Sequence, residues 1–156
     1  MTQCLAATRS EFIEKIGLMA QADGLPRIAG RVLGLLVWDG AAVSFGELAQ
    51  SLLVSRASIS TATRILEQRR LIKRIAKPGQ RQDFWQLADN PYSKLLEYFA
   101  DGMIRARGEI AQTIAQIPDH EAEIKARVQA YADFYRAMSE AVAKLAQDLG
   151  QERAEF

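Results

Sequence analysis

Hydrophobic side chains recur at helical spacing along most of the chain. Residues 9–21 predict a helix whose apolar face consists of Phe12, Ile13, Ile16 and Met19. The next segment, residues 26–38, is apolar nearly all round. A helix without a polar face is normally the buried centre of a small domain. Gly30 and Gly34 lower helix propensity there, so we expect them to allow close packing of a neighbouring helix.

Two shorter helices are predicted after the break at Asp39-Gly40. Ala42-Val43 has the pattern of one short strand. Ser44 and Glu47 have the spacing of a capping box, which starts a helix that ends near Leu52. Ser55 is a good N-cap for a second helix, residues 56–70. The buried stripe of that helix is predicted to consist of Ile59, Ala62, Ile65 and Leu66.

A hairpin is predicted to follow these helices. Residues 71–76 and 81–87 have strand character, and Lys77–Gln80 joins them. Pro78 and Gly79 stand where a type II turn favours them, because the third position of that turn needs a positive φ. The sequence therefore predicts a two-stranded β-hairpin that projects between helical segments.

The C-terminal part of the chain predicts two long helices. The first begins at Asn90-Pro91 and stops at Pro118. In the second, apolar residues alternate at spacings of four and three: Ile124, Val128, Tyr131, Tyr135, Met138, Val142, Leu145 and Leu149. Such heptad spacing is typical of a coiled-coil seam. One small module cannot cover so long a seam, so we expect it to be the interface with a second copy of the chain.

Positive charge is concentrated in one short segment. Residues 55–82 contain eight Lys or Arg and one acid, Glu67, in a chain of net charge +1. The basic residues are Arg56, Arg64, Arg69, Arg70, Lys73, Arg74, Lys77 and Arg81. A neutral protein with one strongly basic segment is expected to present that segment to a polyanion.

The predicted order of elements is that of a winged helix-turn-helix. We expect a mainly α fold with a small β-hairpin wing, in which residues 1–90 bind DNA and residues 91–156 form a helical dimerisation region. An α-helix fits the major groove of DNA, and the hairpin can reach the adjacent minor groove or backbone. The candidate DNA-contacting residues are Ser44, Ser55, Arg56, Ala57, Ser58, Ser60, Thr61, Arg64, Lys73, Lys77, Gln80 and Arg81.

Within this region the sequence resembles the MarR superfamily of bacterial transcription regulators, most closely its GbsR-like branch. The resemblance spans about residues 10–90 and is carried by Leu25–Arg31, Glu47–Ala49, Val54–Ser60, Leu66-Glu67, Leu71–Arg74 and Pro78–Phe84. It implies a homodimer that binds a palindromic double-stranded operator, a repressor role, and control by a small-molecule effector. The MarR superfamily often has an acid and an arginine in the wing. Here the wing tip has only Arg81 as a charged side chain that can read DNA, with Asp83 beside it.

Several residues allow a second interpretation. Arg64 can contact DNA or pair with Glu67 three residues on. Lys73 and Arg74 alternate along a strand, so at most one of them faces DNA. Asp83 can orient Arg81 or simply end the turn. Arg69 and Arg70 are better explained as C-terminal charges that complement a helix dipole.

The aromatic residues also have two interpretations. Packing in the core or the dimer interface is the simpler one, and an aromatic cage for a quaternary ammonium effector is the alternative. The residues concerned are Trp38, Phe45, Trp85, Tyr92, Tyr98, Phe99, Tyr131, Phe134 and Tyr135. Cys4 is a possible redox sensor near a frayed terminus, and His120 is expected at the surface without a metal role.

Other functional classes find little support in the sequence. There is no apolar run long enough for a membrane span and no signal peptide, and the single cysteine suits the reducing cytoplasm. No nucleotide loop, catalytic constellation or metal-ligand cluster is visible, so we expect no enzyme, no cofactor and no metal. The alternative to a DNA-binding regulator is a winged helix that serves only protein interaction or dimerisation.

Overall fold

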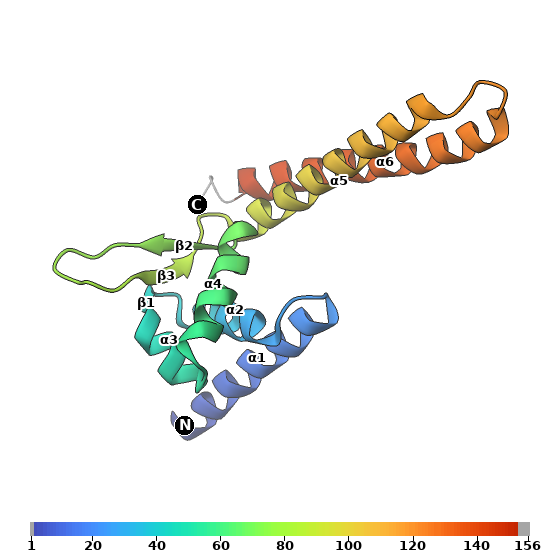
Figure 1. Ribbon diagram of the computed structural model, residues 1–156. Helices are drawn as coiled ribbons and strands as arrows, with labels where there is room; N and C mark the ends of the chain where they lie inside the picture. Colours follow the sequence, from blue (N-terminus) through green and yellow to red (C-terminus); the bar gives the residue numbers. More distant parts are fainter. Residues whose placement is uncertain (1, 153–156) are drawn as a thin grey trace. The chain divides into compact units, whose positions relative to one another are not determined.

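The computed structural model describes residues 2–152, without the side chains of residues 2, 3 and 152, and the chain divides into two units (Figure 1). The first unit contains α1 (Thr2–Ala22), α2 (Arg27–Asp39), β1 (Val43–Ser44), α3 (Phe45–Leu52), α4 (Arg56–Gln68), β2 (Ile72–Ile75) and β3 (Phe84–Leu87). The second unit consists essentially of α5 (Pro91–Gln116) and α6 (Ala122–Glu152). The predicted mainly helical winged-helix fold is confirmed.

Helices α1 and α2 pack at very short range through small residues. A Cβ atom at Gly30 would lie 2.5 Å from Ala20 Cβ and 2.6 Å from the carbonyl oxygen of Ile16, so only glycine fits there. The expected role of this glycine is confirmed. The predicted apolar face of α1 is wrong at Met19, whose side chain is 61% exposed. The close approach selects the small Ala20 for the buried position instead.

The core of the first unit is built on α2, as its continuous apolar sequence predicts. Its fully buried side chains interlock with those of α3 and α4. The largest fully buried side chains of these three helices are Val32, Leu35, Leu36, Leu48, Ile59 and Leu66. Helix α4 ends at Gln68 rather than residue 70, because Arg70 adopts a left-handed conformation with a φ of 62°.

The wing is a hairpin in a three-stranded antiparallel sheet of order β1-β3-β2. Gly79 has a φ of 76° and the Gln80 N–H donates to the Lys77 carbonyl oxygen at 3.1 Å, which confirms the predicted turn. The return strand begins at Phe84, later than the predicted Arg81. The Asp83 carbonyl oxygen instead accepts the Phe45 N–H at 3.0 Å, which ties the wing to the start of α3.

Helices α5 and α6 form an antiparallel hairpin (Figure 1). The Ser93 hydroxyl donates to the Ala146 carbonyl oxygen at 2.7 Å and joins the two helices at their open end. Ala132, Ser139 and Ala146, seven residues apart, are the buried positions of α6. The single seam expected from the heptad pattern is therefore split. Val128, Tyr135, Val142 and Leu149 are half-buried, whereas Ile124, Tyr131, Met138 and Leu145 are exposed.

Candidate nucleic-acid interface

Helix α4 presents one continuous exposed stripe. Ile59, Ala62 and Leu66 are buried and anchor the helix in the core. The opposite face exposes Arg56, Ala57, Ser60, Thr61 and Arg64 to solvent. These positions recur after three or four residues, so their side chains lie along one side of the helix. The stripe brings together five of the candidate residues.

The start of α4 is capped as predicted. The Ser55 hydroxyl accepts the N–H of Ser58 at 3.1 Å, and the two hydroxyls lie 2.9 Å apart. The remaining N–H groups of the first turn have no partner within the helix. They point out of its N-terminal end, where they can bind an anion such as a phosphate. Ser55 and Ser58 therefore shape the helix start, and Arg56 stands beside it.

Arg64 is exposed and is not paired with Glu67. Among residues 2–152 no hydrogen bond or ion pair to its guanidinium is found. The alternative interpretation, a helix arginine satisfied by its neighbour, therefore has no support. A guanidinium that projects into water from the C-terminal end of the stripe is available to a guanine edge or a phosphate.

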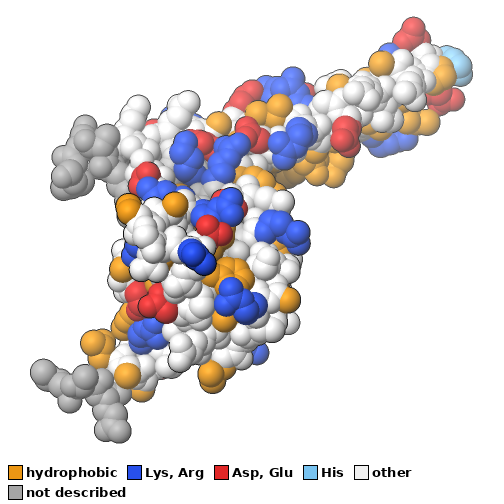
Figure 2. Space-filling view, turned by 60° about the vertical axis from the view of Figure 1, so that its left-hand side comes forward, with side chains coloured by type: hydrophobic (Ala, Val, Ile, Leu, Met, Phe, Trp, Pro, Cys, Tyr) orange, Lys and Arg blue, Asp and Glu red, His pale blue; other side chains and the backbone are white. Residues whose placement is uncertain are grey.

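The wing carries further exposed polar and charged side chains. Lys77, Gln80 and Arg81 are all exposed at the hairpin end. The Lys77 ammonium lies 4.1 Å from the centroid of the Phe84 ring, which holds it near the hairpin. Arg81 has no hydrogen-bond or ion-pair partner in the part of the chain that the structure describes. Figure 2 shows several Lys and Arg side chains (blue) on one face of the molecule.

Two basic residues of β2 are occupied within the fold. The Lys73 ammonium donates to both carboxylate oxygens of Asp89 at 2.8 Å. Arg74 donates to Asp83 at 3.3 Å, so Asp83 orients Arg74 rather than Arg81. Each cation thus has an acid beside it, which agrees with the expectation that at most one of the two faces DNA. Lys73 stays a prediction, as a candidate DNA-contacting residue that has an acidic partner within the fold.

Ser44, another candidate residue, is buried by the fold. It is only 2% exposed, and both of its polar groups serve the predicted capping box. Its hydroxyl accepts the Glu47 N–H at 3.2 Å, and its own N–H donates to Glu47 at 2.8 Å. Hydrogen bonding of the Ser44 side chain, and then of its backbone N–H, to the Glu47 carboxylate lowers the pKa of Glu47. The capping box is confirmed, and its completeness is the reason that Ser44 has nothing left to offer a phosphate.

Phe45 is a residue of this surface that the sequence did not single out for DNA binding. The Arg56 guanidinium carbon lies 4.6 Å from the centroid of the Phe45 ring. The two residues occupy the first turns of α3 and α4, eleven positions apart. Their contact arises from the packing of the two helices, so no local sequence pattern predicts it.

The remaining candidates lie away from this surface. Trp38 packs on Phe12 with ring centroids 5.5 Å apart, and Trp85 is buried, which fits ordinary core packing. Cys4 is exposed on α1, and His120 is exposed between α5 and α6. In the described residues no cluster of His, Cys, Asp and Glu could hold a metal ion. Within the same residues, no helix is both long and apolar enough to cross a membrane.

The sequence and the fold both match known regulators. The sequence model of the MarR family matches residues 23–83. The HTH-type transcriptional regulator MmpR5 of Mycobacterium tuberculosis is 40% identical over 84 residues, which are 53% of this chain and 51% of that protein. The putative HTH-type transcriptional regulator YvaV of Bacillus subtilis is 25% identical over 89 residues, 57% of this chain and 50% of that protein. The chain thus spans about half the length of the curated relatives it matches.

A solved crystal structure of a transcriptional regulator extends the likeness beyond the wing. It is 27% identical to this chain, with a TM-score of 0.84, and the match covers 92% of this chain and 99% of the other. Over residues 23–83 the chain is therefore similar in sequence to the MarR family, and the chain is similar in sequence and fold to a transcriptional regulator.

Proposed function

We propose that this chain is a homodimeric transcription regulator that binds palindromic double-stranded DNA in a sequence-specific manner. The observation that carries the proposal is the exposed stripe of α4, which ends in Arg64, unpaired among the described residues, together with a wing that exposes Lys77 and Arg81. The concentration of positive charge in residues 55–82 supports the same surface.

In this proposal the stripe and the wing have different tasks. The α4 stripe lies in the major groove, where Arg64 contacts a guanine edge and Ser60 and Thr61 contact bases or phosphates. Lys77, Gln80 and Arg81 follow the neighbouring minor groove and backbone. The first turn of α4, capped by Ser55, directs its N–H groups at a phosphate. Base contacts then provide specificity, and phosphate contacts provide register and most of the salt-dependent affinity.

The proposed dimer is formed through the exposed apolar face of α6. Ile124, Tyr131, Phe134, Met138 and Leu145 are large hydrophobic side chains that remain exposed beside α5. Figure 2 shows hydrophobic side chains (orange) at the surface of this hairpin, between charged ones. A row of such residues on one helix is typical of an interface rather than of a monomer surface. A second copy of α6 has the same apolar row with the same heptad spacing, so the two rows can pack against each other in the proposed dimer.

The assignment to a branch of the superfamily, the repressor role and the effector rest on the sequence resemblance alone. The motifs from Leu25 to Phe84 support the GbsR-like branch of the MarR superfamily, with a repressor role and a small-molecule effector. An effector of this kind is expected to lower operator affinity when it binds. Titrating candidate small molecules into the preformed DNA complex and following the release of DNA tests this part.

The proposal is tested by selecting bound duplexes from a randomised pool and measuring their affinity by fluorescence anisotropy. We expect an enriched palindromic sequence that outcompetes its scrambled version. Arg64→Ala should then lower operator affinity roughly 5- to 150-fold, the equivalent of about 1–3 kcal/mol for a lost bidentate base contact. Arg127→Ala on α6 removes the same charge and serves as the control, with an expected change below about twofold.

Two outcomes would contradict the proposal. If Arg64→Ala and Arg81→Ala both bind the selected duplex as tightly as the wild type, the α4 stripe and the wing do not read DNA. If no sequence is enriched and scrambled DNA competes equally, the winged helix is better explained as a protein-interaction or dimerisation module.

A further inference from the structure

The turn that joins α3 to α4 contains a leucine in an unfavourable environment. Leu53 follows the last residue of α3 with a φ of 53°, a left-handed conformation that leucine rarely adopts. Its side chain is 91% exposed, so burial does not compensate for the strain. The N–H groups of Leu53 and Val54 bond back to the carbonyl oxygens of Gln50 and Ala49 at 3.3 and 3.1 Å. Contacts from outside the turn must therefore help to hold it.

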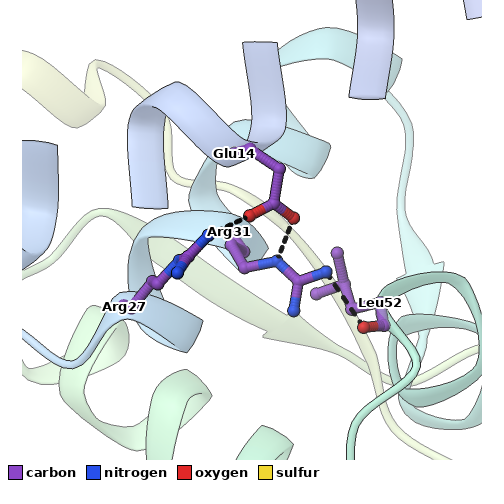
Figure 3. Close-up of polar contacts among 4 residues, drawn as sticks. All are labelled: Glu14, Arg27, Arg31 and Leu52. Atoms are coloured by element: carbon purple, nitrogen blue, oxygen red, sulfur yellow. Dashed lines mark hydrogen bonds and ion pairs between the residues drawn. The ribbon is translucent and has the colours of Figure 1, made fainter. Parts of the chain in front are cut away.

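Arg31 of α2 supplies such a contact. Its Nη2 donates to the carbonyl oxygen of Leu52 at 3.0 Å (Figure 3). The last carbonyls of a helix lack partners within it, and a cation is favourable at that end. The Arg31 side chain is only 21% exposed, so its charge is shielded from water and its position is well defined. The contact fixes the residue that immediately precedes Leu53.

Glu14 of α1 orients this arginine. Its Oε1 lies 2.7 Å from Arg31 Nε, and its Oε2 accepts a hydrogen bond from Arg27 Nη2, also at 2.7 Å (Figure 3). The hydrogen bond from Arg27, together with the charge of Arg31, holds the pKa of Glu14 below its usual range. One carboxylate thus bridges two arginines of α2, and one of these reaches on to α3.

The backbone of α1 leaves room for the arginine stem. A Cβ atom at Gly17 would lie 2.7 Å from Arg31 Cγ and 3.2 Å from Arg27 Cγ. Gly17 is therefore the position on α1 that lets the two side chains lie flat against the helix and reach Glu14. The path from α1 to the α3–α4 turn is continuous: Glu14, Arg31 and the Leu52 carbonyl oxygen.

We propose that Arg31 is a positioning residue for α4: held by Glu14 of α1, it fixes the α3–α4 turn through the Leu52 carbonyl and so sets how α4 is presented to DNA. This inference rests on the proposed function. The buried residues Ile59, Ala62 and Leu66 hold the middle and end of α4. Its first turn, with Arg56 and Ala57, depends on the turn that Arg31 fixes. Loosening α1 therefore affects the DNA-reading stripe without any contact between α1 and DNA.

Glu14→Gln separates this inference from simple electrostatics. The substitution raises the net charge by one, so charge alone would strengthen DNA binding or leave it unchanged. We expect the opposite for the selected operator, a loss of roughly five- to tenfold, while affinity for scrambled DNA is retained. Glu11→Gln is the matched control. It makes the same charge change on the same helix, but Glu11 pairs only with Lys15 among the described residues, so operator affinity should not fall.

A second measurement does not depend on DNA. Amide hydrogen exchange at Leu53 and Val54 reports the turn directly. We expect at least roughly tenfold faster exchange in Glu14→Gln and in Arg31→Lys, which keeps the charge but has no guanidinium to span both partners. The amides of Ala62 and Leu66 should exchange as in the wild type, which shows that the fold is intact.

The outcomes are distinguishable. Unchanged exchange at Leu53 and Val54 in both variants overturns the inference, whatever happens with DNA. Faster exchange without any loss of operator affinity overturns the positioning role. If the wild type selects no DNA sequence at all, the proposed function fails, and a positioning role toward DNA fails with it, while the exchange data still decide whether α1 holds the turn.

Discussion

The guanidinium of Arg56, at the first turn of α4, lies over the ring of Phe45, at the first turn of α3, with 4.6 Å between the guanidinium carbon and the ring centroid. The aromatic ring limits where the arginine can go, and its face attracts the cation. Arg56 is exposed and stands at the edge of the proposed DNA-binding stripe. Phe45 therefore orders a charged side chain before DNA arrives.

This contact predicts a coupling between the two residues. Phe45→Leu should weaken operator binding by about 0.5–1 kcal/mol, roughly two- to fivefold, which is the range of an exposed cation–π contact. In an Arg56→Ala background the same substitution should have no further effect. A double-mutant cycle measured by anisotropy checks this. Equal losses in both backgrounds would mean that Phe45 acts through packing alone.

The wing predicts a change in salt dependence. Six to ten phosphate contacts per dimer would weaken binding by about 10³–10⁵ between 50 and 200 mM salt. Arg81→Ala removes one such contact from each protomer and should lower the slope of log affinity against log salt by about one per contact. Discrimination between operator and scrambled DNA should change little. A salt titration of wild type and variant measures both quantities, and an unchanged slope would remove Arg81 from the interface.

The close packing of α1 on α2 predicts a strong effect of one methyl group. Gly30→Ala places a Cβ 2.5 Å from Ala20 Cβ and 2.6 Å from the Ile16 carbonyl oxygen, and the backbone oxygen cannot rotate away. We expect a loss of about 1–3 kcal/mol in the free energy of unfolding. Gly108→Ala in α5 is the control, because nothing lies within 4 Å of its added Cβ. There the better helix propensity of alanine should stabilise by up to about 1 kcal/mol. Urea unfolding of both variants and of the wild type measures these changes in the free energy of unfolding.

The exposed face of α6 predicts the position of the dimer interface. Leu145 is 50% exposed on this face, and Leu145→Asp would place a charge in the proposed interface. We expect a shift from dimer to monomer, because an unpaired charge is costly to bury. Gln147→Asp adds the same charge at another exposed position of α6 and should leave the dimer intact. Sedimentation analysis of both variants gives the mass, and a dimeric Leu145→Asp would move the interface elsewhere.

The Glu14 bridge predicts a pH dependence of stability. The arginines lower the pKa of Glu14 in the folded chain, so the carboxylate binds fewer protons there than in the unfolded chain. Its stabilising contribution is therefore fully present above the unfolded pKa of about 4.3 and is lost as the pH falls through the lower, folded pKa. The difference in unfolding free energy between wild type and Glu14→Gln should be constant from pH 8 to 6 and shrink below about pH 4.5. A pH series of urea unfolding curves measures it. A difference that persists undiminished at low pH would show that the ion pairs are not its source.

The sequence by itself determined the elements that local rules govern. The spacing of Ser44 and Glu47 predicted the capping box, and Pro78 and Gly79 predicted the turn of the wing. The continuous apolar run of residues 26–38 predicted the central helix. The alternation of buried and exposed positions along α4 followed from its period, so the stripe from Arg56 to Arg64 was foreseeable. These signals depend on neighbours only a few positions away in the chain.

Only the tertiary structure decided which polar groups remain available. Lys73 and Arg64 are both basic residues near the predicted recognition helix, yet the fold brings Asp89 to Lys73 and no acid to Arg64 among the described residues. The contacts of Arg31 with Glu14 and with Leu52, 17 and 21 positions away, likewise depend on how the helices pack. The heptad of α6 was visible in the sequence, but its division into half-buried and exposed rows depended on the small residues of the same helix that pack beside α5. Pairing between distant residues is set by packing geometry, which no local pattern contains.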